Sequence, residues 1–156
     1  MSRLIKLTVL IGLLLPVVFV KASGPVSPIS KFDEFGDTGC EAEMARLDNI
    51  AIQLQNSPDT KAVLVFFGGK MFGGKLPRNG DAAARAARLK PNLVSRRGIP
   101  FNRVMVFDGG YADAWHVEVW IVPSDFWFPP PKTVIPESGV KFRKGRSNPR
   151  DFRCGI

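Results

Sequence analysis

The spacing of apolar residues changes several times along the chain, and each change predicts a different element. Residues 40–56 carry apolar positions three and four apart, which is the period of one helix face. This stripe consists of Met44, Leu47, Ile50, Ala51 and Leu54. Asp37 or Thr38 is available as the N-cap, and Pro58 follows the last turn. The pattern therefore predicts a helix over 40–56.

Two stretches on either side of this helix predict strands. Residues 62–67, AVLVFF, are apolar at every position, as in a central strand covered by helices. Residues 29–35 carry a weaker pattern, in which Phe32 and Phe35 are the apolar positions. We therefore expect one buried strand and one marginal strand, with a long glycine-rich loop after residue 67.

A second helical stripe begins near Asp81. It consists of Ala82, Ala86, Leu89 and Leu93. Pro91 lies inside this pattern. Because proline lacks the backbone donor and clashes with the preceding turn, we expect it to kink or interrupt the helix, at a cost of about 3 kcal/mol. Gly98 then marks the end of the element.

Two further strands are predicted after this helix, separated by a turn. Residues 103–107 form the first strand, and DGGY at 108–111 provides the turn. Residues 115–122 then alternate in the manner of a half-buried strand. One face of this strand carries Trp115, Val117, Val119 and Ile121, and the other carries His116, Glu118 and Trp120.

The order strand, helix, strand, helix, strand, strand defines the expected fold. It predicts an α+β two-layer sandwich over 23–123, in which a mixed sheet of about four strands carries two helices on one face. Residues 124–156 form a Pro-rich aromatic segment and a basic tail. The stretch DFWFPPPKTVIP (residues 125–136, the aromatic strap) cannot join a sheet interior, so we expect it to lie across the body with its aromatics tucked in. A groove for a proline-rich partner is the alternative.

The first 22 residues have the composition of a secretory signal peptide. Arg3 and Lys6 precede an apolar run over 7–20, which is too short for a comfortable membrane span. We therefore expect a periplasmic or secreted protein that is cleaved after Ala22, and an uncleaved anchor is the alternative. No cysteine stands at the cleavage point, which argues against a lipoprotein.

The net charge of +8 is concentrated at the two ends of the chain. The leader contributes +3 and the last eighteen residues contribute +5, so residues 23–138 are neutral. Such a body is not that of a nucleic-acid-binding domain. The tail KFRKGRSNPRDFR favours peripheral electrostatic attachment to anionic lipids or polymers, and a solvated tail is the alternative. Phe142 and Phe152 are too few for membrane insertion.

Cys40 and Cys154 are the only cysteines of the chain. In an oxidising compartment an even pair favours a disulfide, and free thiols are the alternative. Their spacing fits no metal site, and His116 is the single histidine. We therefore expect neither a metal nor a cofactor.

Four stretches within roughly residues 40–110 carry a family resemblance. They read LDNIAIQLQNSP, AVLVFFGG, RAARLKPNLVSRRGI and NRVMVFDGG. In the third, Arg85-Ala86 is followed by Leu89, Leu93 and the turn Gly98-Ile99. This spacing resembles that of the C-terminal domain of outer-membrane-protein-A-like proteins. The resemblance implies a non-enzymatic domain of the bacterial envelope that binds peptidoglycan.

The resemblance also implies a two-point clamp for a diaminopimelate side chain, made by an arginine on the second helix and an aspartate in the loop before it. Arg85 matches the arginine, but the loop carries Lys70 where the aspartate is expected, and a lysine repels the ligand's ammonium. Asp81 is the nearest substitute, yet four residues before Arg85 its expected role is an intrahelical ion pair. The expected site is therefore cationic, and it binds peptidoglycan or another anionic envelope polymer or has lost its ligand. Its residues are Arg85, Lys70, Lys75 and Arg88.

A nucleotide-binding site and a hydrolase active site are the alternatives to this cationic site. FFGGKMFGGK at 66–75 approximates a nucleotide-binding P-loop, but Leu76 replaces the Ser or Thr that holds magnesium, so we exclude a nucleotide. A wall-glycan hydrolase would need a carboxylate pair drawn from Asp108, Asp113 and Glu118. Turn chemistry explains Asp108, and His116 has no nucleophile motif beside it. We therefore expect no enzyme activity.

Overall fold

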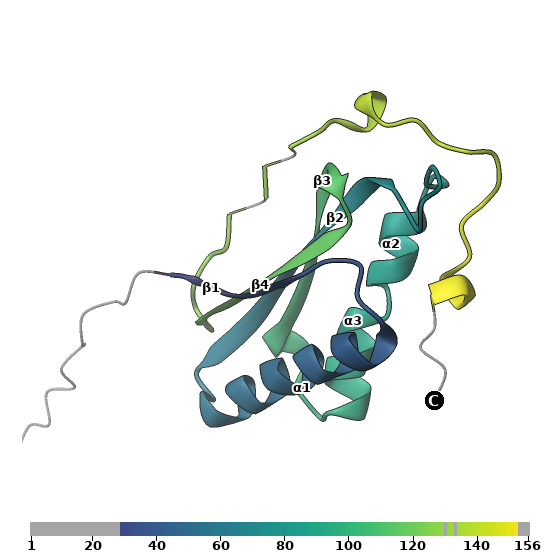
Figure 1. The fold of residues 1–156 in the computed structure, drawn as a ribbon. Coiled ribbons are helices and arrows are strands. Elements are labelled where there is room, and N and C mark those ends of the chain that lie inside the picture. Colours follow the sequence, from purple (N-terminus) through teal and green to yellow (C-terminus); the bar gives the residue numbers. More distant parts are fainter. Residues whose placement is uncertain (1–28, 130, 133, 153–156) are drawn as a thin grey trace, which may run out of the picture.

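The computed structural model describes residues 29–129, 131, 132 and 134–152, and Figure 1 shows their fold. In chain order the main elements are β1 (Lys31–Phe35), α1 (Cys40–Asn56), β2 (Thr60–Met71), α2 (Asp81–Ala86), α3 (Leu89–Pro91), β3 (Val104–Ala114) and β4 (His116–Pro123). Short helical turns cover Asn92–Arg96, Phe101–Arg103, Glu137–Gly139 and Pro149–Phe152. The expected leader, 1–22, lies outside the described residues. Among the helices that are described, none has the length and apolar character needed to cross a membrane.

The four strands form one mixed sheet in the order β1-β4-β2-β3. β4 runs antiparallel to both of its neighbours, whereas β2 and β3 are parallel. The parallel pair requires a crossover, and the α2–α3 region provides it. The protein is therefore an α+β fold with a mixed four-stranded sheet, as the residue pattern predicts.

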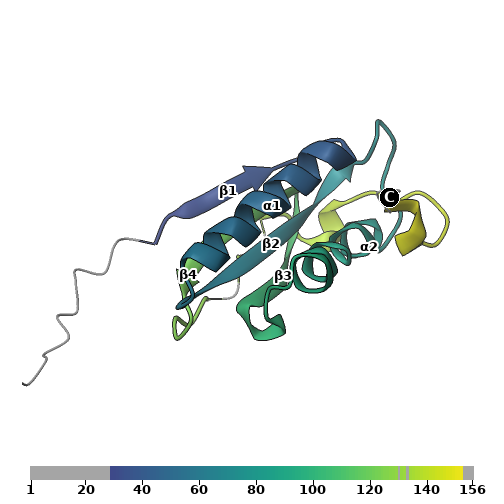
Figure 2. The same ribbon diagram turned by 90° about the horizontal axis from the view of Figure 1, so that it is seen from below.

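The helices lie on one face of the sheet, where they enclose the larger of two cores. Figure 2 shows α1 lying over the sheet, roughly along the direction of its strands, with α2 beside β3. One buried cluster joins residues of α1, such as Leu47, to Leu89 and Leu93 of the second helical region and to Val117 of β4. The helices therefore form a single layer on the sheet.

The aromatic strap covers the other face, and this explains why β2 is apolar on both sides. Ala62, Leu64 and Phe66 enter the helix-side core, and the alternate residues Val63, Val65 and Phe67 enter a second cluster. Phe126 and Phe128 of the strap pack against that second cluster. The expected tucking of the strap aromatics is confirmed for Phe126 and Phe128, whereas Trp127 is 74% exposed. The two helices lie on one face of the sheet, as predicted, and the strap rather than a helix covers the other face of β2.

α1 has the predicted bounds and the predicted buried stripe, but not the predicted cap. Leu47, Ile50 and Leu54 are fully buried. The N-cap is Gly39, which makes no side-chain cap hydrogen bond. Neither Asp37 nor Thr38 caps the helix, because both lie before Gly39 in the loop from β1, where Asp37 makes a different contact.

The second helix is broken into three segments. α2 ends at Ala86, α3 covers three residues, and a π-helical turn follows over Asn92–Arg96. Pro91 cannot donate a backbone hydrogen bond, and Asn92 instead donates from both its backbone and its side chain to the carbonyl of Arg88. The predicted interruption is confirmed. Gly98 closes the region with a left-handed φ of 69°.

The predicted turn at residues 108–111 is wrong, because β3 continues through it to Ala114. The pairing with β2 shifts register between Phe66 and Gly68, so the DGGY sequence forms a bulge. A Cβ on Gly109 would lie 2.4 Å from the ring of Phe67, which explains why a glycine is needed inside the strand. The chain instead reverses at Trp115, between β3 and β4.

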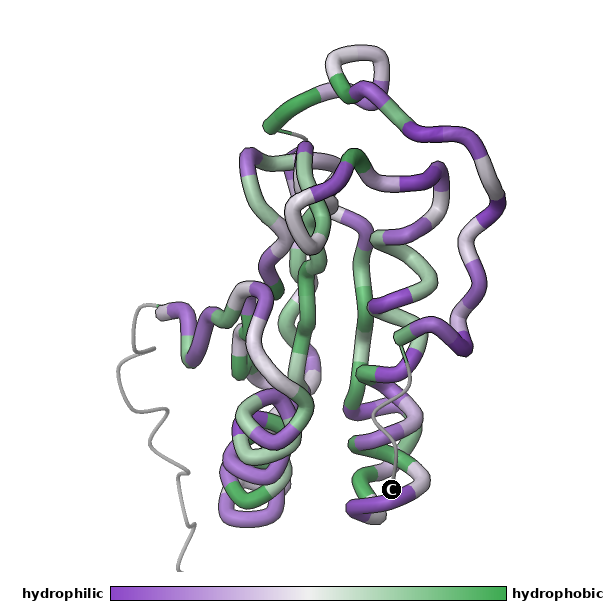
Figure 3. The backbone as a smooth tube through the Cα atoms, turned by 45° about the vertical axis from the view of Figure 1, so that its right-hand side comes forward, coloured by the Kyte–Doolittle hydropathy of each residue, from purple (hydrophilic) through white to green (hydrophobic). Residues whose placement is uncertain are grey.

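Beyond β4 the chain wraps around the body. In Figure 1 it passes over the far end of the sheet and descends beside α2, and Figure 3 shows this outer run to be largely hydrophilic. Ile135 pairs with Tyr111 of β3, and Arg143 donates its backbone N–H to the carbonyl of Pro77. The described part of the basic tail is thus held on the body.

Candidate functional site

The glycine-rich stretch at 66–75 divides into a strand end and a tight hairpin. Gly68 and Gly69 belong to β2. Phe72 and Lys75 then exchange two backbone hydrogen bonds of 2.7 and 3.0 Å around Gly73 and Gly74, whose φ angles are 53° and 73°. Two consecutive residues with positive φ are typical of the two-residue turns that match strand twist. The hairpin at 72–75 places Phe72 over the second helix.

Arg85 of α2 lies beneath this hairpin and is almost fully buried, with 3% of its side chain exposed. Its guanidinium contacts the faces of two aromatic rings, and its central carbon lies 5.1 Å from the centroid of Phe72 and 4.7 Å from that of Trp115. Aromatic faces attract cations most strongly where water is excluded. The rings therefore partly replace the hydration that burial removes from Arg85.

Two carboxylates lie close to the guanidinium of Arg85 and offset its positive charge. Its Nη1 donates to Asp37 at 2.7 Å, and its Nη2 lies 3.9 Å from the carboxylate of Glu43. Burial lowers the pKa of Arg85, and the hydrogen bond to Asp37 acts in the opposite direction. Asp37 keeps 56% of its side chain exposed, so it connects this buried cation to solvent.

The predicted ion pair between Asp81 and Arg85 is wrong. Asp81 is buried, and its carboxylate accepts a hydrogen bond of 2.7 Å from the backbone N–H of Arg78, at the start of α2. This contact closes the turn that leads into the helix, and it leaves Arg85 to pair across the fold with Asp37.

Three buried polar atoms around Arg85 have no hydrogen-bond partner among the described residues. They are Nε of Arg85, Nε1 of Trp115 and Oγ1 of Thr38. Trp115 is the ring beneath the guanidinium, and Thr38 follows Asp37 in the same loop. Because buried polar groups are nearly always paired, this group marks the site as unusual.

Arg88 forms a second buried ion pair next to the first. Its Nε and Nη2 both donate to the carboxylate of Glu43, which is 1% exposed. Its Nη1 donates to the carbonyl of Phe152, and the ring of Phe152 packs edge-on against Phe72 with centroids 5.2 Å apart. The C-terminal turn therefore helps to cover Arg85.

The two lysines of the predicted cationic site lie apart from this centre. Lys70 pairs with Asp113 at 2.8 Å, and both side chains are exposed. Lys75 is exposed at the end of the hairpin. The structure thus brings Arg85 and Arg88 together around Glu43, and it places Lys70 and Lys75 outside that group.

The three carboxylates considered for hydrolysis have separate surroundings. Asp108 accepts from the backbone N–H of Gly110, inside the β3 bulge. Asp113 pairs with Lys70, and Glu118 accepts from Lys31 and Trp120. Asp108 and Glu118 line different hollows, so these two carboxylates do not face a common site. Among the residues that the structure describes, no cluster of histidine, cysteine and acidic side chains is arranged to hold a metal.

Comparisons with known proteins leave the family open. No protein-family model matches the chain, and no curated protein matches its sequence.

The partners of Arg85 were not predicted, although one of them carries a signal. Glu43 stands four residues before Leu47 and seven before Ile50, so this acidic residue lies on the apolar stripe of its helix. A carboxylate in that position indicates a buried cation opposite. Asp37, Phe72 and Trp115 carry no comparable signal, because loops and a strand reversal bring them to the site.

Proposed function

We propose that the chain is a non-enzymatic wall-binding module of an exported envelope protein, in which Arg85 and Asp37 hold the charged ends of a wall-peptide side chain. The observation that carries this proposal is the pairing of a buried guanidinium with a half-exposed carboxylate at 2.7 Å. Lys70, which stands where the resemblance implies an aspartate, lies near the end of β2, and Asp37, from the loop after β1, supplies the missing charge.

The two groups suit a ligand that carries a carboxylate and an ammonium. A guanidinium binds a carboxylate through two parallel hydrogen bonds, and a carboxylate accepts from an ammonium. Nε of Arg85 has no partner among the described residues, so it is available to donate to a ligand carboxylate. The exposed part of Asp37 is available to the ammonium.

A ligand reaches Arg85 only when its cover moves. Phe72 lies over the guanidinium, and the hairpin that carries it turns on Gly73 and Gly74. Phe72 is itself only partly buried. We therefore assign to the hairpin at 72–75 the role of a cover that is displaced when the wall peptide binds.

Sedimentation with purified peptidoglycan, competed by free diaminopimelate, tests the clamp. Asp37→Asn removes the charge that accepts the ammonium, while the backbone and the size of the side chain stay the same. A charge-assisted hydrogen bond contributes about 1.5–3 kcal/mol. We expect retention of this variant to weaken by about tenfold or more. Phe72→Ala uncovers Arg85 and should strengthen retention.

Asp113→Asn is the matched control, since Asp113 is an exposed aspartate paired with Lys70, away from Arg85. It should bind the wall as the unchanged protein does. The clamp is disproved if Asp37→Asn, with an unchanged unfolding temperature, is retained as well as the control.

Electrostatic attachment is a second candidate function, favoured by the way the basic tail is held. Arg78 bonds to the carbonyl of Arg146 and pairs with Asp151, so the segment lies along the body. Its exposed cations are Lys141, Arg143, Lys144, Arg146 and Arg150. Such a charged strip should bind anionic vesicles at low salt. Because salt screens exposed charges, binding should disappear as ionic strength rises, and salt-resistant binding would rule this mode out.

A further inference from the structure

A groove lies on the sheet face opposite the helices, between the sheet and the aromatic strap. Its volume is about 530 Å³, within the range of small-molecule sites. Val65, Phe67 and Trp120 line it from the sheet, and Phe126 and Phe128 line it from the strap. The groove is separate from Arg85, which lies on the helix side.

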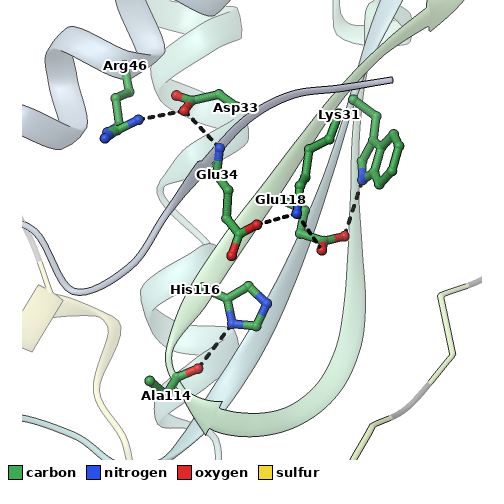
Figure 4. A network of polar contacts seen from close by, with 8 residues as sticks. Lys31, Asp33, Glu34, Arg46, Ala114, His116 and Glu118 are labelled. Atoms are coloured by element: carbon green, nitrogen blue, oxygen red, sulfur yellow. Dashed lines mark hydrogen bonds and ion pairs between the residues drawn. The ribbon is translucent and has the colours of Figure 1, made fainter. Parts of the chain in front are cut away.

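The one carboxylate that lines this groove has a donor on each of its two oxygens. Glu118 accepts hydrogen bonds from Lys31 at 3.2 Å and from the indole N–H of Trp120 at 3.3 Å. Figure 4 shows the ammonium of Lys31 between the carboxylates of Glu34 and Glu118. Lys31 is thus shared by two carboxylates, and neither oxygen of Glu118 lacks a donor within the fold.

Lys132 supplies the unpaired charge of the groove. It lines the groove and is exposed, and it forms no ion pair with any residue that the structure describes. Both oxygens of Glu118 have donors within the fold, so the charged group of the groove that is left for a ligand is the ammonium of Lys132. This charge pattern is complementary to a ligand with an apolar body and an anionic end.

The groove has few groups with which to bind a polar chain. The backbones of β2 and β4 are paired with each other, and Pro129 and Pro131 have no N–H to donate. The indole N–H of Trp120 is used by Glu118. A peptide or a glycan would leave many of its polar groups unpaired here, at a cost that a hydrocarbon chain does not incur.

We propose that this groove binds a single-chain anionic amphiphile, with the hydrocarbon chain between sheet and strap and the carboxylate on Lys132.

Displacement of a fluorescent fatty acid, cis-parinaric acid, from the full protein tests this proposal. We expect saturable binding of the probe, displacement by palmitate, and displacement by hexadecanol only at concentrations at least tenfold higher. Val134→Glu places a charge at the groove on a side chain that is already 69% exposed, so the fold should persist while affinity falls at least tenfold. Lys132→Glu should abolish the preference for palmitate over hexadecanol.

Trp127→Ala is the matched control, because Trp127 belongs to the same strap but does not line the groove. It should leave probe affinity unchanged, and Asp37→Asn should do so as well, which separates this site from the proposed wall clamp. The proposal is overturned if the probe does not bind saturably or if Val134→Glu has no effect. It is also overturned if a proline-rich peptide displaces the probe at lower concentration than palmitate. Equal displacement by palmitate and hexadecanol would remove Lys132 from the site.

Discussion

At the scale of single residues, Glu43 joins the two halves of the helical layer. It lies in the first turn of α1, yet it accepts two hydrogen bonds from Arg88 and lies within 3.9 Å of Arg85. Removing one partner of a buried ion pair is costly because the remaining charge stays buried without compensation. Here two arginines would lose their shared carboxylate.

Glu43→Ala should therefore lower the free energy of unfolding by about 3–5 kcal/mol, as measured by urea denaturation. Glu41→Ala is the control, since Glu41 lies in the same turn but is exposed, and it should cost less than about 1 kcal/mol. A loss below about 1 kcal/mol for Glu43→Ala as well would show that Arg85 and Arg88 are satisfied without it.

The sequence identifies the cation of this site and misses its counterions. Arg85 stands out because of its place in a motif, whereas Asp37 is separated from it by 48 residues and reaches it only when β1 joins the sheet. Asp81, the carboxylate closest in sequence, is used by the backbone of Arg78. Pairing across a fold depends on loop conformation, which residue spacing alone does not determine.

At the scale of elements, the glycines of β2 are explained by close backbone contact. A Cβ on Gly69 would lie 2.5 Å from the backbone nitrogen of Trp115 and 2.8 Å from the carbonyl oxygen of Met71. Backbone atoms cannot move aside as the end of a flexible side chain can. Gly69 therefore allows the chain to approach the β3–β4 reversal that carries Trp115 beneath Arg85.

Gly69→Ala should consequently lower the free energy of unfolding by about 3 kcal/mol, the upper part of the range for overpacking. Gly39→Ala has open space around its new methyl group and should cost less than about 1 kcal/mol, from the weaker helix cap alone. Chemical denaturation of both variants gives the comparison. Equal losses would mean that the sheet end adjusts freely around residue 69.

Regular elements were predictable where one period runs without interruption. The helical pattern of residues 40–56 predicted both ends of α1 correctly. The alternation along residues 115–122 predicted which side chains of β4 face the core, and Val117 and Val119 are buried. The DGGY sequence misled because a glycine pair favours a turn and also permits a bulge beside a large ring such as Phe67. The same glycine pair is compatible with a turn and with a bulge, and the contact with the neighbouring strand β2 determines which of the two forms.

At the scale of the whole molecule, the chain end returns to the first helix. Arg88 binds both Glu43, three residues after Cys40, and the carbonyl of Phe152, two residues before Cys154. Cys154 lies outside the described residues, so the predicted Cys40–Cys154 disulfide stays a prediction. The shared contacts of Arg88 support it, because they hold the neighbours of both cysteines to one side chain.

Peptide mapping by mass spectrometry without reduction should recover a Cys40–Cys154 cross-linked pair from protein purified under oxidising conditions. Closing so long a loop stabilises the fold by about 4 kcal/mol in the chain-entropy model, so reduction should lower the unfolding temperature. Two separately alkylated peptides from unreduced protein would show free thiols instead.

The central place of β4 in the sheet affects how the chain can be made. β4 lies between β1 and β2, and Lys31 of β1 pairs opposite Trp120. A polypeptide that leaves a ribosome or a secretion channel N-terminus first presents β1 and the apolar β2 long before their common partner is available. Unpaired apolar strands in such an intermediate are prone to aggregate. The sheet can therefore close only after about residue 123 has emerged, when β4 becomes available to pair with β1 and β2.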